Sequence, residues 1–170
     1  MELLVSANAS VNVKDADNRT PLLDALSLQW YPMALALVLA NVDVNESGRC
    51  SLDTGQIHAK WCTKGPAELA FCTGQMDSLS MLAAAGADLN PVRSLVLDNS
   101  IPDILYQCSG FFEWVDNVLW SPSSLQLLCR AKARQLLGSR IRHDLLPHLP
   151  LPSTIIRYLN MSDLHSKPNN

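Results

Sequence analysis

The sequence predicts an all-α protein made of stacked helix pairs and a short helical hairpin at the carboxyl end. Three observations lead to this fold class. A five-residue motif recurs along the chain, apolar residues follow helical spacing between its copies, and proline and glycine mark the expected helix ends. The 170 residues are 48% apolar and 17% charged, a composition that suits a small repeat array with a terminal module.

The recurring motif has three copies, at 8–12, 41–45 and 86–90. Asn41 follows Asn8 by 33 residues, whereas Gly86 follows Asn41 by 45 residues. The longer spacing indicates an insertion, and the sequence on either side places it within 46–64. Helices with apolar residues on two sides cannot be buried by one pair alone, so neighbouring pairs are expected to stack.

Proline residues start most of the expected helices, and Thr20 is placed to cap the first of them. We expect helices at 21–28, 32–40, 66–72 and 77–85. After Asn90 the pattern weakens, and we expect a degenerate last unit over 91–119 with helices at 101–106 and 111–120. Its apolar residues are expected to close the stack and contact the C-terminal helix; they are Leu105, Phe111, Phe112, Val115 and Leu119.

Three asparagines stand at turns that require a left-handed backbone: Asn8, Asn18 and Asn41. Asparagine tolerates this conformation better than most residues, so we expect glycine to replace each of them without harm.

The 33-residue period, the Thr20-Pro21-Leu22 signal and the paired helices resemble the ankyrin repeat. This resemblance implies a solenoid with short β-turn fingers over 1–119, whose groove binds a protein. Residues 1–5 resemble the tail of a second ankyrin helix, so we expect a truncated form of a longer receptor.

A second pattern lies at 121–160. Residues 124–133 predict a helix that starts after Ser121-Pro122 and ends at Gly138. Its apolar stripe contains Leu125, Leu128, Cys129, Ala133, Leu136 and Leu137. A proline-rich extended stretch follows at 149–152 and leads into an amphipathic segment.

Both signals resemble those of the SOCS box, a three-helix module that couples receptors to elongin B/C and a cullin. The elongin-binding motif is matched by Ser124, Leu125, Cys129 and Ala133, with Leu128 on the same stripe. The cullin-selecting motif is matched by Leu149, Pro150, Leu151, Pro152 and Ile155. The resemblance spans 121–160, and a flexible tail is expected at 161–170.

The two resemblances together imply a substrate-recognition adaptor of an elongin B/C–cullin-5–RING ubiquitin ligase. Such an adaptor is not an enzyme: it holds a target protein for ubiquitination and proteasomal degradation. The alternatives are an ankyrin scaffold or decoy that binds elongin without delivering a substrate, and a thiol enzyme built on Cys62 or Cys72 with His58.

Two surfaces are candidates for binding the target. The insertion carries His58 and Trp61, and the first helix turn carries Trp30 and Tyr31. Tryptophan is frequent at interface hot spots. Trp61 folding back to anchor its own loop is an equally good interpretation.

Composition argues against several other classes. The net charge of −3 gives no broad basic field, so we expect neither nucleic acid nor membrane as a partner. The local basic cluster is expected to be a solvated face; it consists of Arg130, Lys132, Arg134, Arg140 and Arg142. The five cysteines are irregularly spaced and the four histidines are scattered, so we expect reduced thiols, no catalytic residues, no metal and no cofactor. We expect a cytoplasmic protein, with the nucleus as the alternative.

Overall fold

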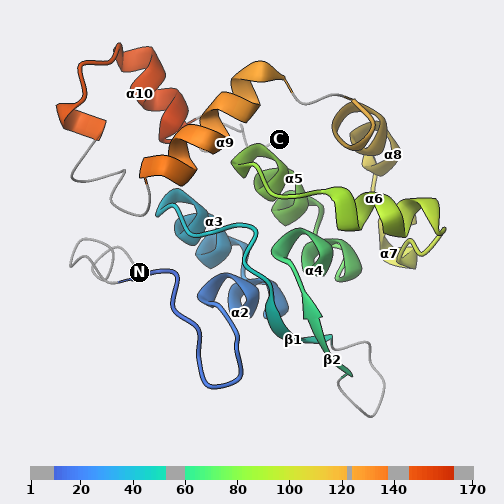
Figure 1. Ribbon diagram of the computed structural model, residues 1–170. Helices are drawn as coiled ribbons and strands as arrows, with labels where there is room; N and C mark the ends of the chain where they lie inside the picture. The colour runs from blue at the N-terminus through green and yellow to red at the C-terminus, as the bar shows by residue number, and fades with distance from the viewer. Residues whose placement is uncertain (1–9, 53–59, 122–123, 138–145, 163–170) are drawn as a thin grey trace.

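The computed structural model describes residues 10–52, 60–121, 124–137 and 146–162, which are mostly helical with one small sheet (Figure 1). The array elements are α2 (Pro21–Ser27), α3 (Tyr31–Leu39), β1 (Gly48–Leu52), β2 (Lys60–Lys64), α4 (Pro66–Cys72), α5 (Met76–Ala85), α6 (Asn90–Leu97), α7 (Asp103–Tyr106), α8 (Phe111–Trp114) and the π-helical turn η1 (Val115–Leu119). The C-terminal elements are α9 (Leu125–Leu137), the 3-10 turn η3 (Leu146–His148) and α10 (Ser153–Leu159). Within the described ranges, every helix is too short or too polar to cross a lipid bilayer.

The first four helices confirm the sequence prediction, since their ends lie within one residue of the expected positions. Thr20 caps α2 by accepting a hydrogen bond at its Oγ1 from the backbone N–H of Leu23 (3.2 Å). The pairs stack in two layers, with α2 against α4 and α3 against α5. Stacking buries the apolar residues on both sides of each helix.

The recurring motif of the sequence makes a recurring hydrogen bond in the structure. The side-chain oxygen of Asn12 accepts the backbone N–H of Asp43 (2.8 Å), and Asn45 does the same for Asp88 (2.7 Å). The last residue of one copy thus holds the third residue of the next. This bond ties successive units together at a fixed offset.

The last unit differs from the prediction. Its helix in the α2–α4 layer is α6, which packs on α4 and which the sequence pattern did not predict. The segment expected as the first helix, 101–106, contains only the single turn α7, and the second expected helix changes to a π-helical turn at Val115. Pro91 in the first turn of α6 explains the early start, because proline favours that position.

The prediction for the apolar residues that close the stack is also only partly right. Leu105, Phe111, Val115 and Leu119 are buried in the main core, but Phe112 is exposed. The C-terminal helix α9 packs against α5 and α10. Figure 1 shows it crossing the ends of α3 and α5.

The predicted left-handed turns are confirmed where the structure describes them. Asn18 and Asn41 both have φ of 62°. Asn8, like the segment 1–5, lies outside the described residues.

The insertion forms an antiparallel hairpin of β1 and β2, with Gly48 opposite Lys64 and Cys50 opposite Cys62. Cys50 is buried in the main core, and β1 contacts α2. The hairpin is therefore packed onto the array at its base.

The described residues form two apolar clusters. The main cluster runs through the array and also includes Met161, which follows α10. The smaller cluster has Leu146 and Leu159 at its centre, with Ala133 and Leu137 of α9 packed against them. The C-terminal segment is thus joined to the array core through Met161.

Candidate functional site

Helix α9 begins at a well-formed cap. Ser124 Oγ accepts the backbone N–H of Leu127 (3.2 Å), and its carbonyl accepts that of Leu128 (3.1 Å). Ser124, the small residue of the predicted elongin motif, therefore fixes where the helix starts. Leu125 is then the first helical residue.

The outward face of α9 is largely apolar. Leu125 is 77% exposed, Leu128 54% and Leu136 75%, and Cys129 is exposed between them. Residues three, four and seven or eight apart share one side of a helix, so these side chains form one stripe, in which the exposed Lys132 stands between Cys129 and Leu136. We call this stripe, formed by Leu125, Leu128, Cys129 and Leu136, the apolar face.

The predicted stripe divides in the structure. Ala133 and Leu137 are half-buried and pack against Leu146 and Leu159, so they belong to the small C-terminal cluster. Of the predicted elongin-binding residues, Leu125, Leu128 and Cys129 lie together on the apolar face. Ala133 lies at its inner border.

The buried face of α9 carries two arginines, each only 4% exposed. Arg134 donates from Nη2 to the carbonyl of Val38 (2.7 Å) and from Nη1 to that of Leu159 (2.6 Å). Arg130 donates from Nη2 to the carbonyl of Ala84 (2.8 Å), and its guanidinium lies 4.3 Å from the centroid of the Tyr158 ring. The expectation of a solvated basic face is therefore wrong for Arg130 and Arg134.

The physical reason is the position of the acceptors. Val38, Ala84 and Leu159 stand at the carboxyl ends of α3, α5 and α10, where the last carbonyls lack the regular helical bond and the helix dipole is negative. The carbonyl of Val38 also accepts the backbone N–H of Asn41 (3.0 Å). Two guanidinium groups satisfy these ends. Lys132 of the same cluster is exposed as predicted, and Arg140 and Arg142 lie outside the described residues.

Two loop residues adapt the array to α9. Asn41 donates from Nδ2 to the carbonyl of Arg134 (2.9 Å). Gly86 has φ of 89°, and a Cβ placed on it would lie 2.4 Å from the Cβ of Ala131. Both residues occupy the first position of the recurring motif. This position turns the chain, and in these two copies it also contacts α9.

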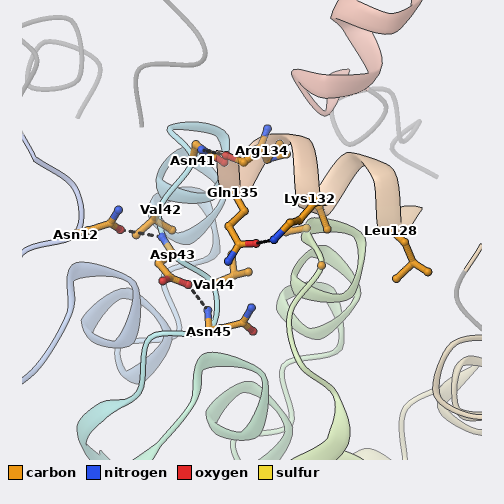
Figure 2. Close-up of a pocket in the computed structure, with 13 residues that line it drawn as sticks. Asn12, Asn41, Val42, Asp43, Val44, Asn45, Leu128, Lys132, Arg134 and Gln135 are labelled. Carbon is orange, nitrogen blue, oxygen red and sulfur yellow. Dashed lines mark hydrogen bonds between the residues drawn. The ribbon is translucent and has the colours of Figure 1, made fainter. Parts of the chain in front are cut away.

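A cavity of about 360 Å³ remains between α9 and the 41–45 loop. Figure 2 shows Gln135 extending from α9 toward this loop, where its Oε1 accepts a hydrogen bond from Lys132 Nζ (3.0 Å). Leu128 stands at the border of the cavity and on the apolar face. The arginines and Ala131 hold α9 against the array, and the cavity lies beside these contacts, since Ala131 and Arg134 also line it.

The predicted cullin-binding residues lie next to α9. Leu149 and Leu151 are half-buried and pack against Leu146 and Leu159, whereas Pro150 and Pro152 are exposed. Ile155, in the first turn of α10, is 44% exposed. The leucines therefore fix the segment, and the two prolines and Ile155 are available to a partner.

Three of the predicted target-binding residues lie in the described part of the chain, at two places. Trp30 is 52% exposed at the turn between α2 and α3, and Tyr31 beside it is half-buried. Burial raises the pKa of the Tyr31 hydroxyl, and the carboxylate of Asp77 raises it further. Trp61 belongs to β2, opposite Ser51, and His58 lies outside the described residues. The hairpin joins α2 at its beginning, whereas Trp30 follows its end.

Comparison with known families supports the C-terminal assignment. The family model of the SOCS box matches residues 121–160. No curated protein matches the chain. A SOCS box implies binding of elongin B/C and a cullin, and proteins that carry it are generally adaptor subunits of ubiquitin ligases rather than enzymes.

Proposed function

We propose that this chain recruits a target protein to a ligase made of elongin B/C, cullin-5 and a RING subunit. The observation that carries the proposal is the orientation of α9. An amphipathic helix of a monomeric protein normally buries its apolar side and exposes its basic side. Helix α9 instead buries Arg130 and Arg134 and exposes three leucines of its apolar face, within a segment that matches the SOCS box. This arrangement supports the apolar face as a binding site for elongin C.

Leu125 is the expected anchor of this interface. Complete burial of a leucine side chain contributes roughly 1.5 to 3 kcal/mol. Cys129 lies one turn further on, where a small side chain lets the partner approach closely. Leu128 and Leu136 extend the contact along the helix.

The first test measures binding of elongin B/C to the full chain. Leu125→Ala is expected to weaken binding at least tenfold, since it truncates the expected anchor. Leu28→Ala is the matched control, because Leu28 is 74% exposed but lies at the α2–α3 turn. Equal binding by both variants and the unchanged chain would show that the apolar face is not the site.

A second variant removes the contact more completely. Leu125→Pro combined with Cys129→Phe is expected to abolish elongin binding. Proline is tolerated at the first position of a helix, so α9 persists while its anchor is lost. An unchanged circular dichroism spectrum is the control for folding of the array.

The cullin-5 assignment is proposed for the segment 149–155. Pro150→Ala with Pro152→Ala is expected to reduce assembly with cullin-5 while elongin B/C still binds. The measurement is co-purification of the cullin with the preformed elongin complex. Loss of elongin binding in the same variant would instead assign these prolines to the fold of the C-terminal segment.

The ankyrin-type array is proposed as the part that binds the target. The stacked pairs and the repeated Asn-to-backbone bond support this interpretation of the array. Trp30 and Tyr31 on one edge, and Trp61 and His58 of the insertion, remain the candidate contacts. If the chain binds elongin and the cullin but no protein gains ubiquitin in its presence, the scaffold or decoy function is correct instead.

A further inference from the structure

Two aromatic side chains are exposed together in the last unit of the array. Tyr106 of α7 is 45% exposed and Phe112 of α8 is 55% exposed, and their ring centroids lie 5.9 Å apart. Phe112 also meets the buried ring of Phe111 edge-on, with 5.3 Å between the centroids. Figure 1 shows α6, α7 and α8 together at the end of the array opposite α2. The core residue Phe111 thus anchors Phe112, which in turn contacts Tyr106.

Carboxylates border both exposed rings. Asp103 stands on α7 three residues before Tyr106, a spacing that places both on one side of the helix. Phe112, Glu113 and Asp116 share the exposed side of α8 and η1, whose other side is buried in the main core. The three carboxylates are exposed, and within the described part of the chain they form neither ion pairs nor hydrogen bonds. An exposed apolar surface with a polar rim is typical of an interaction site.

This part of the sequence contains no basic residue. Residues 94–129 include four acidic residues and no lysine, arginine or histidine. Arg93, directly before this segment, donates from Nε to the carbonyl of Leu119 (3.2 Å), and its guanidinium lies 5.7 Å from the centroid of the Trp120 ring. Trp120 follows η1 and is exposed. One arginine of the chain thus already lies against an aromatic ring at the far end of η1, whereas the ring pair lies among carboxylates that no basic group of the described residues neutralises.

The rings and the carboxylates favour the same kind of partner. The faces of aromatic rings attract cations, and the planar guanidinium of arginine stacks on them. Exposed carboxylates attract the same side chain and repel acidic ones. A second copy of the chain fits this surface less well, because many of its basic side chains already pair with its own carboxylates; they are Lys14, Arg19, Arg49 and Lys64.

We propose that this surface binds an arginine-rich segment of the target protein. We call it the acidic aromatic surface; it consists of Asp103, Tyr106, Phe112, Glu113 and Asp116. The rings supply stacking area that is already held in place, and the carboxylates select a positively charged segment. This inference rests on the proposed function only in taking the array as the part that binds the target. It extends that function by naming the charge of the bound segment and the unit that binds it.

The test uses the full chain and a fluorescein-labelled peptide in which arginine alternates with serine. We expect saturable binding by fluorescence anisotropy at physiological ionic strength. Phe112→Leu keeps an apolar contact with Phe111 but removes the aromatic face, and it is expected to weaken binding about fivefold. Leu28→Ala, at the α2–α3 turn, is the control for loss of exposed apolar surface.

A second pair of variants tests the charge. Glu113→Gln is expected to weaken peptide binding about threefold, since it removes one carboxylate beside Phe112. Asp77→Asn is the control, because it removes an exposed carboxylate from the first turn of α5. It is expected to leave peptide binding unchanged.

Three results would overturn the inference: absence of saturable binding, equal binding of a peptide in which glutamate replaces arginine, or equal binding by the Phe112→Leu variant and the unchanged chain. An equal loss in Glu113→Gln and Asp77→Asn would also overturn it, since the peptide would then respond to net charge alone. A dimer in sedimentation experiments that Phe112→Leu dissociates would assign the surface to a second copy instead. Elongin B/C binding is measured on the same samples. Its absence in all of them would contradict the proposed ligase function, and its presence without peptide binding would contradict only the role of the acidic aromatic surface.

Discussion

Single charged residues determine how α9 is attached to the array. Arg134 contacts the carboxyl ends of two helices, α3 and α10, through one planar guanidinium group. A forked donor suits this task because each of its nitrogens can reach a different carbonyl. Burying the charge is tolerated because these helix ends concentrate carbonyl oxygens and negative partial charge.

Replacement of Arg134 is therefore expected to destabilise the protein strongly. Arg134→Met keeps most of the side-chain volume but removes both hydrogen bonds, and we expect a loss of about 2 to 4 kcal/mol. Arg134→Lys is expected to recover only part of this stability, since a single ammonium group cannot reach both carbonyls as the forked guanidinium does. The measurement is urea unfolding followed by circular dichroism. Lys132→Met, on the exposed side of the same helix, is the control and is expected to change stability by less than about 0.5 kcal/mol.

A comparison of Asn18 with Asn41 distinguishes the effect of backbone conformation from that of a side-chain hydrogen bond. Asn18 and Asn41 share φ of 62°, and glycine suits this angle at both positions. Asn41 also donates to the carbonyl of Arg134, so the sequence-based expectation that glycine is harmless needs correction there. Asn41→Gly is expected to cost about 1 kcal/mol more than Asn18→Gly in thermal unfolding. Equal losses would show that the bond to α9 contributes nothing.

At the scale of elements, local signals predicted most helices and the apolar stripe of α9. Thr20, Pro21 and the apolar period were enough to place the first four helices, because caps and periodicity act over a few residues. The exposed Leu125 and Cys129 followed from the same period. Whether that stripe packs inside the chain or faces outward depends on the contacts that Arg130 and Arg134 make on the other side of the helix.

The arginine contacts were not predictable in this way. Arg130 binds a carbonyl 46 residues away and Arg134 one 96 residues away, and helical spacing says nothing about such distances. An arginine opposite a leucine stripe is usually solvated, so the local pattern favoured the wrong interpretation. Helix α6 was missed because it begins at Asn90, within the third copy of the motif, whereas α2 and α4 begin only after an intervening segment.

The contact between α9 and the array requires glycine at position 86. Gly86→Ala introduces a Cβ that meets Ala131 and imposes a strained φ of 89°. Gly110 has φ of 86° with open space around it, so Gly110→Ala measures the strain alone. We expect Gly86→Ala to cost at least about 1 kcal/mol more than Gly110→Ala in urea unfolding.

A double variant isolates the clash. Ala131→Gly removes the opposing methyl group, although it weakens the helix by about 1 kcal/mol on its own. The loss in the combined Gly86→Ala and Ala131→Gly variant is therefore expected to be smaller than the sum of the two single losses. Simple additivity would show that the two positions are not in contact.

For the whole molecule, these attachments make the array and the C-terminal segment one folding unit. The small cluster around Leu146 and Leu159 buries little apolar surface, and a segment of this size rarely folds by itself. Met161 enters the array core, and Arg130 and Arg134 join α9 to α3 and α5. The orientation of the apolar face relative to the hairpin is fixed by the same contacts, so a protein bound to the apolar face would stand at a defined position relative to the array.

Native-state hydrogen exchange tests this coupling. In the unchanged chain, the slowest amides of α9 are expected to exchange with the same free energy as those of α3 and α5, because the segment opens only when the array unfolds. In the Arg130→Met and Arg134→Met double variant, α9 is expected to exchange at a lower free energy while α4 and α5 keep most of their protection. Lys132→Met again serves as the control. Exchange of α9 at a distinctly lower free energy in the unchanged chain would show two independent units, and the apolar face would then have no fixed orientation relative to the array.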